Sequence, residues 1–344
     1  MILTGMTEKL RFPLIIAVII ILNSCYPASL IETDVLNPAK KTFDSDIYRI
    51  GVVSRMDLDV KRTSGRIDDE AKNAFKRDSS MLKDAVLGLL DGLAESPRFE
   101  AYTIEHPRVL SGGQSALDRP FQWNLVDKLA RKDTLDLVIS LTAANFKDTV
   151  LRSAQKEGSQ LEKKVYSSGY SEAYILFPHL YWRIYDLRNR DVSNFVQIDT
   201  LVYRAGPNQG YPARKTTVMY LSDAIGDAGY EYSRILAPYW TTLERVWYPT
   251  GDYYFNKASE LANEGKWLEA IEIWRELANS DNSRVASRAS LNMAVASEML
   301  DKIDIAISWA EKSMELGSDY YPELYLKSLK YRKEQREILD KQMK

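Results

Sequence analysis

The last third of the chain carries small residues in a pattern that suits closely packed helix pairs. Ala258 and Ala270 flank Gly265, and Ala294 and Ala306 repeat this arrangement, with Ala306 lying 36 positions after Ala270. Alanine lets two helix backbones approach, while larger side chains fill the space beside them. A unit repeated at such a period is typical of stacked helical hairpins, each of which covers its neighbour's apolar face. The pattern therefore predicts two consecutive helix pairs.

Further residues at turn and aromatic positions also match the pattern of a known family. Trp267 opens the second helix of the first unit, Trp274 takes its aromatic position, and Ile303 and Asp301 occupy the matching helix and turn positions of the second unit. This arrangement resembles the tetratricopeptide repeat, whose period is about 34 residues. The resemblance implies a concave array that binds a partner protein or peptide. A mostly charged helix at 322–341 supplies the polar cap that such an array needs.

The region before the repeats has a different rhythm. Apolar stretches predict strands alternating with two helices, the first of which Gly92 and Pro97 are expected to close. Three aromatic-rich stretches follow and predict antiparallel hairpins, with a turn at 188–191. The predicted strands are 47–55, 99–104, 135–142, 164–177, 180–187 and 192–204, and the predicted helices run from about 71 to 93 and from 121 to 132. The order predicts a mixed sheet with helices on at least one face.

These patterns together predict an α+β protein, with an N-terminal mixed α/β sheet domain followed by a C-terminal all-α, tetratricopeptide-like helical repeat domain. Between the two we expect a connecting helical segment whose path Pro238 and Pro249 bend. The predicted divisions are a signal peptide at 1–24, a tether with a possible first strand at 25–45, the α/β domain at 46–214, the connecting segment at 215–250 and the repeats with their capping helix at 251–344.

The beginning of the chain has the layout of an export signal. Lys9 and Arg11 precede an apolar run from Phe12 to Leu22, which is too short for the roughly 20 residues of a membrane-spanning helix. The run ends in "LNSC", which resembles the lipobox of bacterial lipoproteins. This resemblance implies that the signal is removed before Cys25 and that Cys25 carries the lipid.

A lipidated Cys25 would be the anchor of the mature protein and would use the chain's single cysteine. Disulfides, thiolate catalysis and cysteine-bound metals are then excluded, because no free thiol remains. Several acyl chains acting together give stable membrane binding. We expect the protein to be lipid-anchored in the outer membrane, on its periplasmic face.

Charge and composition narrow the list of partners. The formal net charge is −2, and no basic stripe is present in the sequence. Nucleic acid is not expected as a partner, because lysine and arginine supply most of the affinity for phosphates. The expected partner is an unknown envelope protein or peptide.

The sequence contains few candidates for catalysis. His106 and His179 each adjoin a proline and have no ligand spacing to acidic residues, and "SGGQS" at 111–115 lacks the lysine of a phosphate-binding loop. Five acidic residues are interpreted as a solvated loop and helix cap rather than a calcium site: Asp57, Asp59, Asp68, Asp69 and Glu70. No catalytic residue, cofactor site or metal site is therefore predicted.

A second resemblance covers most of the mature chain. The segment 229–251, joined to "GKWLEAIEIW", resembles a family of uncharacterised lipoproteins of Bacteroides-like bacteria. Its matching residues are Arg234, Pro238, Trp240 and Arg245. That family implies no activity.

Three functions are thus considered. The favoured one is a non-catalytic adaptor that binds a protein through its helical repeats. The alternatives are a periplasmic glycan or small-molecule binding module and an unrecognised hydrolase. The binding module would use the hairpin tyrosines Tyr166, Tyr170, Tyr174, Tyr181, Tyr185 and Tyr203, although strand pairing already accounts for them.

Overall fold

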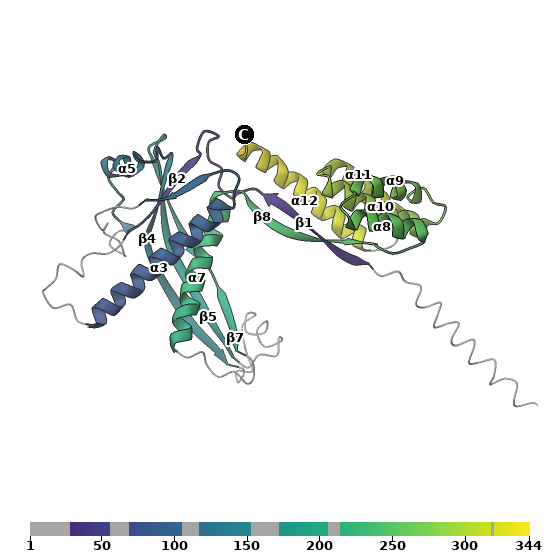
Figure 1. Ribbon diagram of the computed structural model, residues 1–344. Coiled ribbons are helices and arrows are strands. Elements are labelled where there is room, and N and C mark those ends of the chain that lie inside the picture. Colours follow the sequence, from purple (N-terminus) through teal and green to yellow (C-terminus); the bar gives the residue numbers. More distant parts are fainter. Residues whose placement is uncertain (1–27, 56–68, 105–116, 153–171, 206–213, 318–319) are drawn as a thin grey trace, which may run out of the picture. The chain divides into compact units, whose positions relative to one another are not determined.

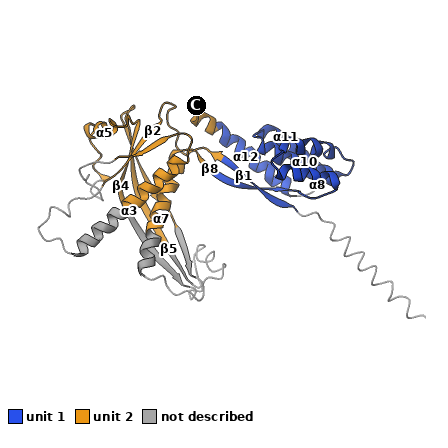
Figure 2. Ribbon diagram, in the orientation of Figure 1, with its two compact units in different colours: residues 1–35, 241–337 blue, residues 36–240, 338–344 orange. Residues whose placement is uncertain are grey.

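The computed structural model describes residues 28–55, 69–104, 117–152, 172–205, 214–317 and 320–344 of the 344-residue chain (Figure 1). The chain divides into two compact units (Figure 2). The helical unit takes residues up to Val35 together with Thr241–Glu337, and the α/β unit takes Leu36–Trp240 with Ile338–Lys344. In sequence, residues 36–240 of the α/β unit are therefore inserted within the helical unit, and its residues 338–344 follow the helical unit.

The α/β unit is built on a mixed sheet with the strand order β3-β2-β4-β5-β6, in which β7 also pairs with β5. β2 is parallel to both β3 and β4, and the remaining pairs are antiparallel. The strands are β2 (Arg49–Ser54), β3 (Glu100–Thr103), β4 (Leu137–Arg152), β5 (Glu172–Asp186), β6 (Asp191–Ile198) and β7 (Leu201–Ala205). This confirms the mixed sheet that the sequence predicts.

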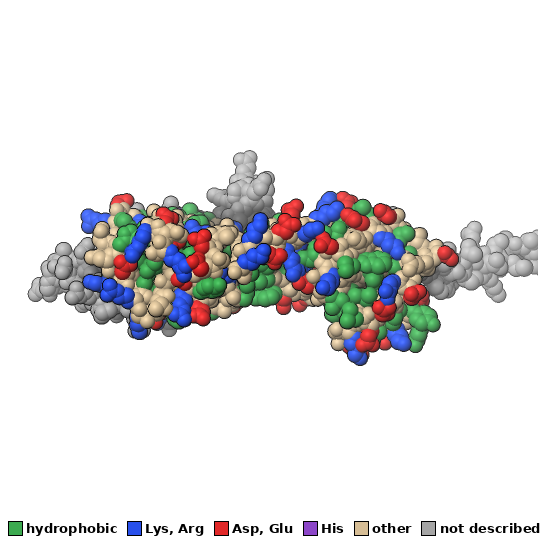
Figure 3. Space-filling model, turned by 90° about the horizontal axis from the view of Figure 1, so that it is seen from above, with side chains coloured by type: hydrophobic (Ala, Val, Ile, Leu, Met, Phe, Trp, Pro, Cys, Tyr) green, Lys and Arg blue, Asp and Glu red, His purple; other side chains and the backbone are tan. Residues whose placement is uncertain are grey.

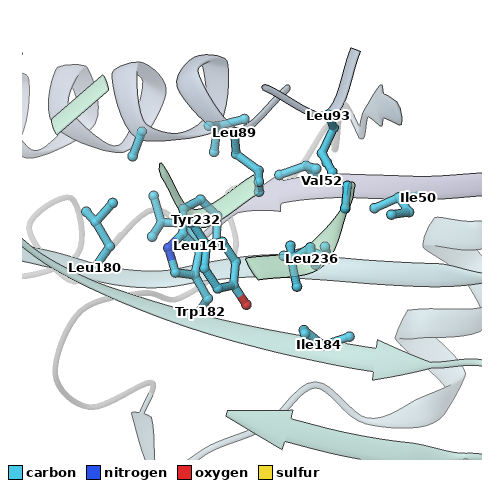
Figure 4. Close-up of a cluster of buried hydrophobic side chains, with 14 of the residues drawn as sticks. Ile50, Val52, Leu89, Leu93, Leu141, Leu180, Trp182, Ile184, Tyr232 and Leu236 are labelled. Carbon is cyan, nitrogen blue, oxygen red and sulfur yellow. The ribbon is translucent and has the colours of Figure 1, made fainter. Parts of the chain in front are cut away.

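Helices cover both faces of this sheet. α3 (Asp69–Ala94) and α7 (Arg214–Leu236) pack on one face, and α5 (Trp123–Ala130) packs on the other. The core under α3 and α7 is apolar and includes Leu89, Leu141 and Trp182, whose indole stacks on Tyr232 with 4.9 Å between ring centroids (Figure 4). Alternate residues of the same strands, such as Val138 on β4, face α5.

Close backbone contact joins α3 to α7. A methyl group at Gly88 would overlap the carbonyl oxygen of Gly226, and one at Gly229 would overlap the carbonyl oxygen of Ala85. The expectation that Gly92 closes the first helix is wrong. Gly92 lies inside α3, where a side chain would overlap Ser233 of α7, so its glycine serves close helix packing rather than a helix end.

Two predicted boundaries in the sheet are also wrong. The stretches 164–177 and 180–187 do not form separate strands, because β5 runs through Pro178 without a break. Proline lacks only the N–H group, and the Pro178 carbonyl still accepts a hydrogen bond from the Asp199 amide at 3.2 Å. β4 extends ten residues beyond its predicted end at Thr142, because β5 pairs with it as far as Arg152. The predicted turn at 188–191 overlaps the observed turn at 187–190.

The helical unit consists of two helix pairs, a final long helix and part of a two-stranded sheet. Asp252 caps α8 by accepting a hydrogen bond from the Phe255 amide, and Asn282 caps α10 in the same way. The elements are β1 (Ser29–Asn37), β8 (Tyr239–Trp247), α8 (Tyr253–Asn263), α9 (Trp267–Leu277), α10 (Ser283–Met299), α11 (Ile303–Leu316) and α12 (Tyr321–Gln342). This unit provides the C-terminal helical region that the sequence predicts.

The segments predicted at 25–45 and 215–250 each contain one strand of a two-stranded sheet. The connecting segment 215–250 is not helical throughout, since α7 ends at Leu236 and β8 begins at Tyr239. The possible first strand within 25–45 is present as β1, which pairs with β8 rather than with the strands of the large sheet. Ile31 of β1 packs against the core of the helical unit, so apolar burial holds this segment in place. None of the described helices is both long and apolar enough to cross a membrane.

Candidate interaction site in the helical unit

The four alanines of the predicted repeats lie in the core of the helical unit. Ala258 and Ala270 are buried on the contacting helices α8 and α9, and Ala294 and Ala306 are buried on the contacting helices α10 and α11. Ile303 is also buried, at the start of α11. The small side chains thus lie in the core that the paired helices share.

The two helix pairs reverse direction through the same backbone geometry. Gly265 between α8 and α9 has φ +77°, and Asp301 between α10 and α11 has φ +59°. Both values lie in the left-handed region that glycine enters without penalty and aspartate tolerates better than most residues. The Asp301 carboxylate also pairs with Arg336 of α12, and this contact favours aspartate at the second turn.

The two tryptophans of α9 differ in their surroundings. Trp274 is fully buried and meets Trp247 of β8 edge to face, with 6.1 Å between ring centroids. Trp267 is half-buried and packs at the margin of the same core. The end of β8 is therefore part of the core of the helical unit.

α10 is covered on all sides, because each residue from 286 to 298 is buried. Part of the cover is the end of β8. Asn292 accepts a hydrogen bond from the Tyr248 amide at 2.8 Å and donates one to the Tyr248 carbonyl at 2.7 Å. The Arg288 guanidinium lies over the Tyr248 ring at 4.5 Å. The middle of α10 therefore leaves no face on which a partner could dock.

A buried group of charged side chains joins β8, α10 and α12. Arg245 donates two hydrogen bonds to the Glu298 carboxylate, at 2.8 and 2.9 Å. Tyr325 and Arg332 each donate a further one at 2.5 Å. Four donors around one carboxylate satisfy a charge that would otherwise destabilise the interior.

These contacts decide the ionisation of Glu298. Burial raises the pKa of Glu298, but the hydrogen bond and the charge of Arg245, with the bonds from Tyr325 and Arg332, outweigh burial and hold the pKa below its ordinary value. Burial raises the pKa of Tyr325 well above its ordinary value, and the Glu298 charge adds to this shift. The carboxylate is therefore ionised and the phenol neutral at neutral pH.

The outer surface of the helical unit carries large exposed side chains. Tyr253 and Tyr254 in the first turn of α8 are 71% and 61% exposed, and their rings meet edge to face. On α12, the exposed residues Tyr321, Leu324 and Tyr331 have a spacing that places them on one side of the helix. Figure 3 shows hydrophobic side chains gathered on one face of this unit. Exposed aromatics of this kind are enriched at protein interfaces.

Of the six hairpin tyrosines considered above, the structure describes the side chains of Tyr181 and Tyr185. Tyr185 is buried under α5, where it stacks on Phe121 at 5.5 Å and accepts a hydrogen bond from the Phe121 amide. Its apolar surroundings account for it, so Tyr185 is not a ligand contact. Tyr181 is half-buried. The side chains of Tyr166, Tyr170, Tyr174 and Tyr203 lie outside the described residues.

The α/β unit also has a polar pocket of about 160 Å³ beside the turn at 187–190. Asn189 bridges two carboxylates of this pocket, donating to Asp44 at 3.2 Å and to Asp186 at 3.0 Å. Lys41 lies over the Phe43 ring at 5.4 Å. The polar groups of Asn189, Asp44 and Asp186 in this pocket are therefore already bound to one another. Among the described residues no group of three or more His, Cys, Asp or Glu side chains could hold a metal ion.

Other residues considered from the sequence lie outside the described parts. These include the lipidation site Cys25, together with His106, the stretch 111–115, Asp57, Asp59 and Asp68. The backbone of Asp69 and Glu70 begins α3. His179 is half-buried on β5.

Sequence reasoning missed the group around Glu298 and the contact between Asn292 and Tyr248. The sequence held one sign that these polar residues are buried. Asn292 and Glu298 stand among the small and apolar residues of a helix that also carries buried alanines. Arg245 was noted through the lipoprotein resemblance, without a role. The structure supplies that role as the partner of Glu298.

The fold thus defines a two-unit protein, with a mixed α/β sheet unit inserted into a unit of helical hairpins and a strand pair. The chain belongs to the family described as Domain of unknown function (DUF8603), whose model matches residues 47–248. A second model, Domain of unknown function (DUF6340), matches residues 256–337. The sequence matches no curated protein.

Two solved structures show weak similarity. Rare lipoprotein B from Shewanella oneidensis has 15% identity and a TM-score of 0.21, covering 35% of this chain and 84% of that chain. A putative neuraminyllactose-binding hemagglutinin homolog from Helicobacter pylori has 9% identity and a TM-score of 0.27, covering 66% of this chain and 94% of that chain. At such TM-scores neither likeness bears on function.

Proposed function

We propose that this chain is a lipid-anchored protein of the bacterial cell envelope that acts as a non-catalytic adaptor. It binds a partner protein or peptide on the outer surface of its helical unit. The observation that carries the proposal is the set of exposed tyrosines on α8 and α12. Tyrosine offers a large contact area with few rotatable bonds, so it loses little conformational entropy when it is buried by a partner.

The proposal places the partner outside the helix pairs. A repeat array holds peptides along its concave side, but here α10 is covered by Tyr248 and its neighbours. Tyr253 and Tyr254 lie at the start of α8 with their side chains exposed. Packing against the core therefore does not account for tyrosine at these positions. Tyr321, Leu324 and Tyr331 offer a second apolar row on α12.

Cross-linking the full-length protein in its native envelope tests the adaptor function. The variant Tyr253→Ser/Tyr254→Ser removes the α8 pair, and Tyr321→Ser/Tyr331→Ser removes the α12 row. We expect at least one of these variants to lose most of the cross-linked partner while keeping its thermal stability. Tyr48→Ser, at an exposed tyrosine of the α/β unit, is the matched control and should retain the partner. Equal recovery from all variants would contradict the proposal.

The anchor is proposed from the position of Cys25 after the apolar run 12–22. We also propose that the anchored protein lies on the periplasmic face of the outer membrane. We further propose that it is related to the Bacteroides-type lipoproteins. Labelling cells with an alkyne fatty acid tests the lipid, because Cys25→Ala should abolish labelling whereas Ser24→Ala should leave it. Fractionation of the two membranes then tests the location.

A further inference from the structure

The strand pair β1–β8 has one face that the helices of its unit do not cover. Residues alternate along both strands, so Arg245 and Trp247 of β8 and Val35 of β1 are buried. Glu32 and Asp34 of β1 point the other way and are exposed. On β8, Thr242 and Glu244 are exposed in the same manner. We call the face formed by these four residues the outer ribbon face.

Three carboxylates gather on this face. The Thr242 hydroxyl donates a hydrogen bond to the Asp34 carboxylate at 2.6 Å, so these two residues are neighbours across the strands. β1 ends and β8 begins in the α/β unit, so the strands run in opposite directions. Glu32 and Glu244, each two residues from this pair, therefore lie on the same side of it. Like charges that face each other across a strand pair are destabilising.

No lysine or arginine offsets these charges on the ribbon itself. The one basic residue of the two strands, Arg245, points inward and binds Glu298. Within the described residues, Glu32, Asp34 and Glu244 are in no ion pair with a basic side chain. The face thus carries three negative charges beside an exposed apolar residue, Leu30, at 57% exposure.

The ribbon also offers backbone hydrogen-bonding groups at its margins. As far as the structure describes the chain, β1 and β8 pair with each other and with no further strand. A two-stranded sheet has two edges, and an extended segment of another protein adds to such an edge through backbone hydrogen bonds. Each strand has nine residues, which is long enough for a specific added strand.

We propose that the ribbon binds an extended, basic segment of a partner protein, which adds to one edge as a third strand. Side chains on one face of such a strand repeat every two residues, about 7 Å apart, which matches the spacing between Glu32 and Asp34. Lysines or arginines at alternate positions then approach the carboxylates, while an apolar residue contacts Leu30. The inference rests on the adaptor proposal for its premise that the protein binds other proteins, and it names the chemistry of one partner.

The test uses the purified full-length protein and a fluorescein-labelled seven-residue peptide of alternating lysine and valine. Fluorescence anisotropy should show binding that weakens as salt rises. Glu32→Gln/Glu244→Gln should weaken it about tenfold, because two of the three charges are lost. The matched control Glu260→Gln/Asp281→Asn removes two exposed carboxylates elsewhere in the unit and should leave the affinity unchanged. A peptide of alternating glutamate and valine should not bind.

A third peptide separates strand addition from attraction between charges alone. It keeps every lysine but carries N-methyl groups on alternate backbone amides, so it cannot pair with an edge, and we expect about tenfold weaker binding. Equal binding of the methylated peptide, or equal loss in the control variant, would overturn the proposal. Tyr253→Ser/Tyr254→Ser should bind the lysine peptide normally. If the lysine peptide fails to bind while the tyrosine variants still lose envelope capture, the ribbon inference fails alone.

Discussion

The two units bury their cores in different ways. Under α3 and α7 the α/β unit buries apolar side chains such as Leu89, Leu141 and Trp182. At the centre of the helical unit, α10 buries Arg288, Asn292 and Glu298 as well as its alanines. Apolar burial stabilises roughly in proportion to area, at about 25 cal/mol per Å². A buried ion pair adds little net stability, but breaking it leaves an uncompensated charge.

The comparison indicates where each unit is vulnerable. The apolar core tolerates substitutions that preserve volume, so its stability depends on the shapes of its side chains more than on particular partners. The interior of the helical unit depends on particular partners, because Asn292 and Glu298 each need donors or acceptors supplied by distant parts of the chain. The predictions below test this difference, beginning with the largest effect.

Removing Arg245 should produce the largest loss of stability. Arg245→Ala leaves Glu298 buried without its bidentate partner, and we expect the free energy of unfolding to fall by about 3 to 5 kcal/mol. Chemical denaturation measures the change. Arg275→Ala is the matched control, because Arg275 pairs with Glu272 at the surface and should cost less than about 1 kcal/mol. Similar losses in both variants would refute the special role of the buried pair.

A substitution at the α3–α7 contact should have the next largest effect. Gly88→Ala puts a methyl group against the Gly226 carbonyl, and the helices must separate at a cost of about 1 to 3 kcal/mol. Gly226→Ala is a control of opposite sign. Its new methyl group would lie 3.8 Å from the Asp84 carbonyl oxygen, and alanine favours helix by up to about 1 kcal/mol. Thermal denaturation of both variants measures the difference, and equal shifts would argue against close helix packing.

The turn at Gly265 should show a smaller effect of purely conformational origin. No atom lies within 4 Å of the position that a Cβ would occupy, so Gly265→Ala introduces no clash. The positive φ still costs alanine about 1 kcal/mol. Gly265→Asp should cost less, because Asp301 adopts a similar φ at the second turn. A stability order with alanine above aspartate would contradict this account.

The smallest predicted effect is the dependence of stability on pH. This dependence is negligible near neutral pH and grows in acid. Because the pKa of Glu298 is lowered in the folded protein, its contribution to stability is fully present above the ordinary value of 4.5 and is lost as pH falls through the folded value. Denaturation at a series of pH values should therefore show a steeper acid loss for the native sequence than for Glu298→Gln. Parallel profiles would show that Glu298 is not held ionised by its partners.

Much of the fold could be predicted from the sequence, because the spacing of apolar and small residues indicates the helices and strands. The stripe from Leu82 to Leu93 predicts the buried side of α3, and the small residues Ala258, Ala270, Ala294 and Ala306 predict the helix pairs. The turn position of Asp301 was also predictable, because Gly265 stands at the equivalent place in the first unit. Such signals are local, and each spans a few tens of residues.

The remaining features depend on contacts between distant segments. β1 and β8 pair across the whole inserted α/β unit, and no local pattern near residue 30 shows that its partner is near residue 242. Arg245 and Glu298 illustrate the same limit, since either residue alone looks like an ordinary surface charge. The run through Pro178 was missed because the pairing of β5 with β4 decides the strand more than local propensity does.

The insertion has a consequence for the order in which the protein can fold during its synthesis. Residues 28–35 leave the ribosome early, but Thr241–Glu337 supply the rest of their unit. The α/β unit has all its strands once residue 205 has been made and its helix α7 follows directly, so that only its residues 338–344 come after the helical unit. β1 must therefore stay unpaired until the chain has been extended past β8.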